Sequence, residues 1–210
     1  MNSIWHEWRR RRRARRVSAH EARPLARAQA RAWSRPAPQD RFLALDLELS
    51  ALSPRQGEIL SMGWVAVDAD RIPLASARHL VLRGEETVGP SAVIHGILDQ
   101  DREGGVALRA ALLCLSRALR GRTLLLFHGG LDQAFLDDAW QRVLGAPFLA
   151  PWRDVQRLAM DRLERQGVPL EGGATTLAAL RRHWKLPPHD AHDALGDALA
   201  TAELFLAQRR

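Results

Sequence analysis

Residues 42–49 read Phe-Leu-Ala-Leu-Asp-Leu-Glu-Leu, an almost continuous apolar run interrupted by two acidic residues. Such a run is typical of a β-strand buried on both faces. Side chains two residues apart point to the same face of a strand, so the four leucines share one face. Asp46 and Glu48 lie on the other face with Phe42 and Ala44. The sequence therefore predicts a buried strand that carries two carboxylates on one side.

Two carboxylates on one face of a buried strand are energetically costly. Asp46 and Glu48 would repel each other, and a buried strand would deprive both of water. A divalent cation bound between them would remove both costs, because hard cations prefer oxygen ligands. The alternative is that this end of the strand reaches water, where each carboxylate is solvated. The spacing alone leaves both interpretations open.

The segments after this strand complete an α/β pattern. Further strands are predicted over residues 58–67, 72–82 and 123–127, the first two joined by a hairpin at 68–71. Helices are predicted over 108–119, 132–144, 154–166, 176–184 and 193–208, with glycines or N-cap residues at several ends. The fold class expected is α/β: a mixed β-sheet with a three-stranded antiparallel start, then parallel strands, flanked by helices.

The charge of the chain is distributed unevenly. The 210 residues carry a net charge of +7, but residues 1–41 carry +9 and the remainder −2. We expect a basic extension over 1–36, a linker over 37–41 and a folded domain over 42–210. The arginines should stay solvated unless a polyanion neutralises them. Interleaved Trp5, Trp8 and Trp33 suit stacking on bases or a membrane surface; a partly helical solvated arm and an organellar transit peptide are the alternatives.

Several classes of protein are excluded by composition. One cysteine, Cys114, rules out a disulfide framework and a multi-cysteine zinc module. Cys114 itself is expected in the core. No apolar run approaches the ~18 residues that a membrane span needs, and no secretory signal core is present. A cytoplasmic protein is expected.

Other acidic and imidazole side chains stand at the starts of predicted helices. Asp132 follows strand 123–127, a usual position for sites in α/β sheets, although it could simply cap a helix. Asp197 lies in the first turn of the last helix, where the helix dipole also favours an acid. Within one helix His192 and Asp197 would project about 140° apart. They can share a site only if His192 lies on the preceding loop. His189 and His192 have zinc-pair spacing but no third ligand nearby.

Taken together, these segments resemble the DnaQ-like 3′–5′ exonucleases with a catalytic histidine, the family of the proofreading subunit of bacterial DNA polymerase III. Asp46-Leu47-Glu48 looks like the first motif, D-x-E. Residues 125–136, LLFHGGLDQAFL, look like the second, and residues 192–205, HDALGDALATAELF, look like the third, H-x4-D. Residues 94–97 resemble a family segment near the substrate, and Asp154 falls where the family often has an aspartate opening a helix.

The resemblance implies an RNase H-like sheet, a nuclease active on 3′ ends of single-stranded nucleic acid, and release of nucleoside 5′-monophosphates. It also implies two Mg²⁺ or Mn²⁺ ions held by Asp46, Glu48, Asp132 and Asp197, with His192 as general base. An imidazole suits that role near neutral pH. The substrate contacts that the resemblance implies are Leu49, Ser50, His95, Gly96, His128 and Phe135.

The chain departs from the family pattern beside these motifs. After D-x-E the family commonly has Thr-Thr-Gly, and here Leu49-Ser50-Ala51 follow. In the second motif the family often has His-Asn where this chain has Phe127 and His128. A weakly active or inactive adaptor that binds nucleic acid or a partner therefore remains the alternative. Recruitment by a polymerase or another protein through the extension, and a homodimer, are also left open.

Overall fold

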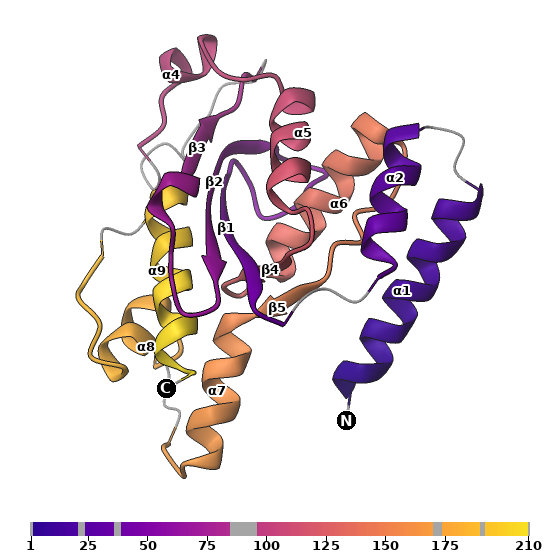
Figure 1. The fold of residues 1–210 in the computed structure, drawn as a ribbon. Coiled ribbons are helices and arrows are strands. Elements are labelled where there is room, and N and C mark those ends of the chain that lie inside the picture. The colour runs from indigo at the N-terminus through magenta and orange to yellow at the C-terminus, as the bar shows by residue number, and fades with distance from the viewer. Residues whose placement is uncertain are drawn as a thin grey trace.

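Five strands form one mixed sheet in this computed structural model, which describes residues 2–20, 24–35, 39–84, 96–169, 174–189 and 192–209. The strands are β1 (Arg41–Leu49), β2 (Ile59–Asp68), β3 (Arg78–Val81), β4 (Thr123–Leu126) and β5 (Trp152–Asp154). Their order is β3-β2-β1-β4-β5, so β1 is central (Figure 1). β1, β2 and β3 pair antiparallel, and β1, β4 and β5 pair parallel. The predicted fold class is confirmed.

The third strand is shorter than the predicted span of 72–82. Pro73 has no N–H for a ladder hydrogen bond, and a 3₁₀ turn at Leu74–Ser76 precedes β3. The Ser76 hydroxyl donates to the Pro73 carbonyl at 2.6 Å and accepts from the Ala66 N–H at 2.9 Å. A side chain thus replaces sheet pairing along this segment. β5 is not predicted by the sequence, because three residues are too few to show an alternation.

The helices cover both faces of the sheet. They are α1 (Asn2–His20), α2 (Pro24–Trp33), α4 (Asp99–Glu103), α5 (Leu108–Ala118), α6 (Gly130–Leu144), α7 (Val155–Arg165), α8 (Leu177–His183) and α9 (Ala194–Ala207). The side chains of Asp154, Thr176 and Asp193 each accept a hydrogen bond from the backbone N–H three residues later. These N-caps explain why the starts of α7, α8 and α9 were predictable to within one residue.

Two hydrophobic cores lie on opposite faces of the sheet. Leu43, Leu45 and Leu47 of β1 pack in the core formed with α5 and α6. Phe42 and Ala44 pack in the core formed with α7, α8 and α9. The alternation read from the sequence is therefore confirmed. The face of Phe42 and Ala44 continues along β1 to the two carboxylates, which places them on the side of the sheet that α9 covers.

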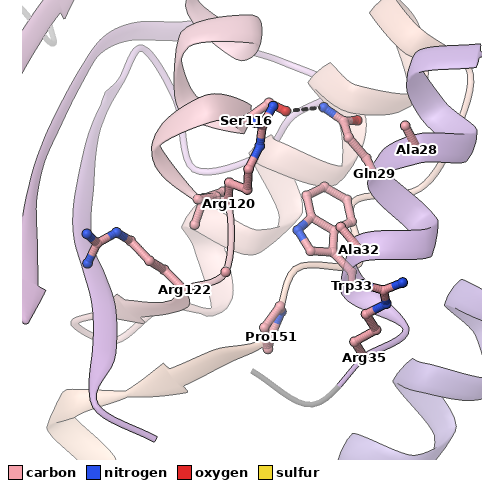
Figure 2. Close-up of a pocket in the computed structure, with 11 residues that line it drawn as sticks. Ala28, Gln29, Ala32, Trp33, Arg35, Ser116, Arg120, Arg122 and Pro151 are labelled. Carbon is pink, nitrogen blue, oxygen red and sulfur yellow. Dashed lines mark hydrogen bonds between the residues drawn. The ribbon is translucent and has the colours of Figure 1, made fainter. Parts of the chain in front are cut away.

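The N-terminal extension is helical, and α2 docks onto the domain. Trp33 is 7% exposed and packs against Trp140 and Phe148, with ring centroids 5.6 and 5.2 Å away. The Gln29 side chain accepts a hydrogen bond from the Trp140 indole at 3.0 Å. It also donates one to the Ser116 hydroxyl, which Figure 2 shows. These contacts differ from a solvated arm, because a buried tryptophan and a buried amide join α2 to α5 and α6.

α1 packs beside α2 at the edge of the molecule, away from α9 (Figure 1). The Arg10 guanidinium donates to the carbonyls of Trp33 and Leu149 at 2.8 and 2.7 Å. Ala14 is fully buried, and Val17 packs against the same core. One face of α1 is therefore fixed to the domain, although its sequence is dominated by arginine.

Two smaller expectations have different outcomes. The prediction that Cys114 lies in the core is wrong: it is exposed on α5, because that helix turns Leu112 and Leu115 inward instead. Across the part of the chain that the structure describes, no helix combines the length and hydropathy needed to cross a bilayer.

Candidate active site

The central strand presents two carboxylates where it leaves the core. Asp46 pairs with Gly63 of β2 and Glu48 with Ser61, and a bulge follows between Glu48 and Leu49. Glu48 is 9% exposed. A bulge bends a strand and ends regular pairing, so the regular pairing of β1 with β2 ends directly after its second acid.

α9 brings a third carboxylate to the same place. Asp197 lies in the first turn of α9, and α9 packs on Gly63, the partner of Asp46. A Cβ at Gly63 would lie 2.2 Å from the carbonyl carbon of Ala194 and from the amide nitrogen of Leu195. Glycine therefore permits an approach that any other side chain would block. A glycine inside a buried strand is a signal for such an approach that the sequence reading did not use.

These three side chains could share a metal ion. One ligand oxygen from each of Asp46, Glu48 and Asp197 lies within 4.8 Å of the other two. Among the residues that the structure describes, no other group of three acidic, histidine or cysteine side chains lies close enough together to bind one ion. His189 and His192, whose zinc-pair spacing lacks a third ligand, are not part of this group, whereas three of the four predicted carboxylates are.

The fourth predicted carboxylate, Asp132, reaches the site from α6. It lies in the first turn of that helix and is 7% exposed. Burial, together with smaller contributions from the charges of Glu48 and Asp154, raises its pKa to about 7. Asp132 is outside the three-residue group, but it is near enough to interact electrostatically with the pair on β1.

The carboxylates of this site resist being charged together. Burial raises the pKa of Asp46 well above its usual range, and the charges of Asp132, Asp197, Glu48 and Asp193 add to this effect. Burial also raises the pKa of Glu48 to about 7, with smaller contributions from Asp197 and Asp193. Ordinary structural acids have charged partners that lower the pKa instead. Divalent cations supply that missing positive charge, so the donor set fits them.

Two histidines contact Asp197, one through its backbone and the other through its ring. His192 lies on the loop before the Asp193 cap, as the sequence requires, with φ = 70°. Its backbone N–H donates to Oδ2 of Asp197 at 3.0 Å, and its side chain is exposed. The imidazole Nε2 of His189 lies 2.9 Å from Oδ1 of Asp197. Sequence reasoning gave His189 only a weak zinc role and missed this contact.

Arg181 of α8 fixes the loop that carries both histidines. It is 3% exposed and donates to the carbonyls of Pro187 and Ala200 at 2.9 Å each, while pairing with Glu203 at 2.8 Å. The start of the loop is thereby tied to α9. The sequence offers no signal for this residue, because arginine is abundant throughout the chain.

Asp154 braces the turn that precedes α6. Besides capping α7, its carboxylate accepts hydrogen bonds from the backbone N–H groups of His128 and Gly129, at 3.3 Å each. His128 has φ = 54°, and its Nδ1 lies 2.8 Å from Oε1 of Gln156. The hydrogen bonds made by Asp154 and Gln156 therefore position the helix start that bears Asp132.

The residues predicted to contact substrate occupy different environments. The Ser50 hydroxyl accepts a hydrogen bond from the Glu58 N–H at 2.8 Å and so closes the loop after β1. Leu49 is half-buried against the first core, and Phe135 is 2% exposed within it. Gly96 is exposed with φ = 67°. His95 lies outside the described residues.

A cavity of about 490 Å³ lies elsewhere, between α2 and the C-terminal end of α5 (Figure 2). Trp33, Arg35 and Gln29 line one side of it, and Ser116 and Arg120 line the other. Arg122, at its margin, is held by Asp68 through two hydrogen bonds. None of the predicted site residues lines this cavity, so it is separate from the acidic cluster.

Comparison with known proteins assigns the family. Residues 43–205 match the exonuclease family of the RNase T type. The chain belongs to this exonuclease family. The match confirms the predicted DnaQ-like relationship and the prediction of an exonuclease-family enzyme. Nuclease and hydrolase chemistry follow from that membership, and the acidic cluster lies inside the matched region.

Two curated relatives are bacterial polymerases. The chain is 26% identical over 165 residues to DNA polymerase III PolC-type of Thermotoga maritima, and equally so to that of Thermotoga petrophila. The aligned region covers 79% of this chain and 12% of each relative. The chain therefore corresponds to a small part of those proteins.

Solved nucleases share the fold of this exonuclease-family chain. E. coli exonuclease I in complex with a dA16 oligonucleotide has a TM-score of 0.70 at 18% identity, covering 82% of this chain and 41% of that one. Cell-death related nuclease 4 has a TM-score of 0.66 at 17% identity, covering 82% of this chain and 64% of that one. These similarities place the mixed sheet and its helices among nuclease folds.

Proposed function

We propose that the chain removes nucleotides from the 3′ end of single-stranded DNA or RNA by metal-dependent hydrolysis, with release of nucleoside 5′-monophosphates. The observation that carries the proposal is the approach of Asp46, Glu48 and Asp197 to within 4.8 Å of one another in a chain of the exonuclease family. The oligonucleotide in the related exonuclease I complex supports a single-stranded substrate.

The proposed cofactors are two divalent cations, Mg²⁺ or Mn²⁺. Asp46, Glu48 and Asp197 would hold them, joined by Asp132 from α6. When bound, such ions polarise the scissile phosphate and make a water molecule more acidic. The raised pKa values of Asp46, Glu48 and Asp132 support this assignment, because cations would favour the charged form of each carboxylate.

His192 is the proposed general base. Its loop position leaves the residue exposed, with its backbone N–H bonded to Asp197. From there the imidazole would take the proton of the attacking water and pass it to solvent. Both oxygens of Asp197 already have protein partners, from the His192 backbone and the His189 ring. These contacts orient the carboxylate, so we infer that His189 positions Asp197.

The proposed substrate contacts depend on the position of each residue and on the bonds that it already makes. Leu49, Gly96 and His128 lie at or beside loops, where they can contact the terminal nucleotide. Ser50 already bonds the backbone of Glu58, so its proposed contact would share one hydroxyl between two partners. Phe135 lies in the core, and we propose that it supports the start of α6 from behind.

The experiment that tests this function uses two copies of one oligonucleotide, labelled at opposite ends. With Mg²⁺ or Mn²⁺, the 5′-labelled strand should give a ladder that shortens progressively. The 3′-labelled strand should lose its label as a mononucleotide in the first step. Asp46→Asn should abolish both signals. Asp70→Asn, which alters an exposed acid on the hairpin, should retain them.

The same experiment decides between this function and the adaptor alternative. An adaptor would bind the oligonucleotide and leave both labels in full-length strands. Activity that survives in Asp46→Asn would contradict the proposed site. Recruitment beside a polymerase, homodimerisation and a cytoplasmic location remain predictions from the sequence.

A further inference from the structure

α1 has two faces with different chemistry. The inward face carries Arg10, Ala14 and Val17, which bond backbone carbonyls or pack against the first core. Spacings of three and four residues put them on one side of a helix. This side is occupied, so whatever else α1 binds must contact the exposed part of the helix surface.

The outward face carries a stripe of four arginines. Arg9, Arg12, Arg13 and Arg16 are all exposed, and they recur at i, i+3, i+4 and i+7. In an α-helix those positions fall within an arc of about 100° and along about 10 Å of the axis. Because the inward face is bonded to the domain, this arginine stripe is held in place instead of moving as a free tail.

The arginine stripe has no carboxylate partner among the side chains that the structure describes. Arg12 lies over the ring of Trp8 at 5.1 Å, and that ring is 49% exposed. Like charges at these spacings destabilise a helix, so a bound polyanion would relieve a cost that the free protein bears.

We propose that the arginine stripe is a second binding surface for the phosphates of single-stranded nucleic acid. The inference rests on the proposed function for its choice of ligand, since that substrate is a polyanion. Arginine suits phosphate because its planar fork gives paired hydrogen bonds, and an exposed tryptophan suits base stacking. α1 lies on the side of the molecule away from α9 (Figure 1). The stripe would therefore contact long strands at nucleotides remote from the 3′ end.

The test measures how salt weakens binding of a fluorescent 30-nucleotide strand, in the Asp46→Ala background so that the strand is not shortened. Each arginine–phosphate contact on a single strand contributes about 0.7 to the slope of log affinity against log salt. R9Q/R12Q/R13Q/R16Q should therefore lower the slope by up to about 3. Between 50 and 200 mM salt, the loss of affinity should therefore be up to about 50-fold smaller in this variant than in the parent.

Three controls isolate the arginine stripe. R71Q/R109Q/R165Q/R182Q removes the same charge from other exposed positions and should change the slope much less. R9K/R12K/R13K/R16K keeps the charge and should restore most of the binding, which excludes an effect of misfolding. Cleavage of a trinucleotide by the glutamine variant, in a background with Asp46 intact, should proceed at the unaltered rate, because α1 lies on the side of the molecule away from α9 (Figure 1).

Several results would overturn the proposal. The first is a salt slope that does not change in R9Q/R12Q/R13Q/R16Q. The second is an equal change of slope in R71Q/R109Q/R165Q/R182Q. The third is binding by R9K/R12K/R13K/R16K that is no tighter than binding by the glutamine variant. Stripe-dependent binding to anionic phosphatidylglycerol vesicles or to an acidic protein, with none to the oligonucleotide, would also overturn it. If no strand is shortened but the slope depends on the stripe, the proposed function fails and this inference stands.

Discussion

Gly63→Ala tests how the fold assembles the acidic cluster. The added Cβ would lie 2.2 Å from backbone atoms of Ala194 and Leu195, whereas ordinary contacts begin at 3.4 Å. α9 must therefore move away from the sheet by about 1 Å, which is the scale of misplacement that can cost a hundredfold in rate. Overpacking of this kind also destabilises a core by about 1–3 kcal/mol.

The assay compares metal-dependent hydrolysis with the free energy of unfolding in the same preparation. We expect Gly63→Ala to lose about a hundredfold in kcat and to remain folded, because the displaced helix carries Asp197 but its apolar face can still pack. Gly104→Ala is the matched control: a Cβ there meets nothing within 4 Å, so its kcat should not change. Full activity and unaltered stability in Gly63→Ala would refute the argument that this contact positions Asp197.

Three further predictions concern the surroundings of the cluster. In metal-free protein the thermal midpoint should fall as pH rises from about 4.5 through about 7. Glu48 and Asp132 have a pKa raised to about 7 in the folded state, so over this range the folded protein holds protons that the unfolded chain has already released. Mg²⁺ should restore the midpoint above that range, and a midpoint that rises with pH in metal-free protein would contradict this. Asp154→Ala should cost about 1–2 kcal/mol in urea unfolding through loss of the α7 cap and should lower kcat, whereas unchanged kinetics would mean that the turn before α6 does not need it. Arg181→Met should destabilise the chain by about 3 kcal/mol, because it leaves buried carbonyls unpaired, and it should lower activity by freeing the loop of His192; a variant as stable and active as the parent would contradict that role.

Local features of the sequence predict the central strand and the helix starts well. The run through Asp46 and Glu48 shows both its burial and its two faces, because alternation along a strand is a local property. Asp154 and Asp193 act as caps within their own helix turns, which is equally local. Pro187 and Pro188, just before His192, favour a loop there, which is again a local signal.

Contacts between distant segments could not be read in the same way. Trp33 contacts Trp140 and Phe148 only in the folded chain. The composition of α2 alone therefore does not predict that this helix packs against the domain. The approach of α9 to Gly63 and the ties made by Arg181 depend on how helices pack across the sheet. His189 was judged by its spacing to His192, whereas its partner in the fold is Asp197.

Metal binding by the cluster of Asp46, Glu48 and Asp197 can be measured without any substrate. Calorimetric titration of the protein with Mn²⁺ at neutral pH should show binding that is abolished or greatly weakened in Asp46→Asn and in Asp197→Asn. The exposed-site variant Asp70→Asn should bind as the parent does. If Asp46→Asn and Asp197→Asn bind Mn²⁺ with the affinity and stoichiometry of the parent, these side chains do not form the metal site, and the account of the active site is wrong.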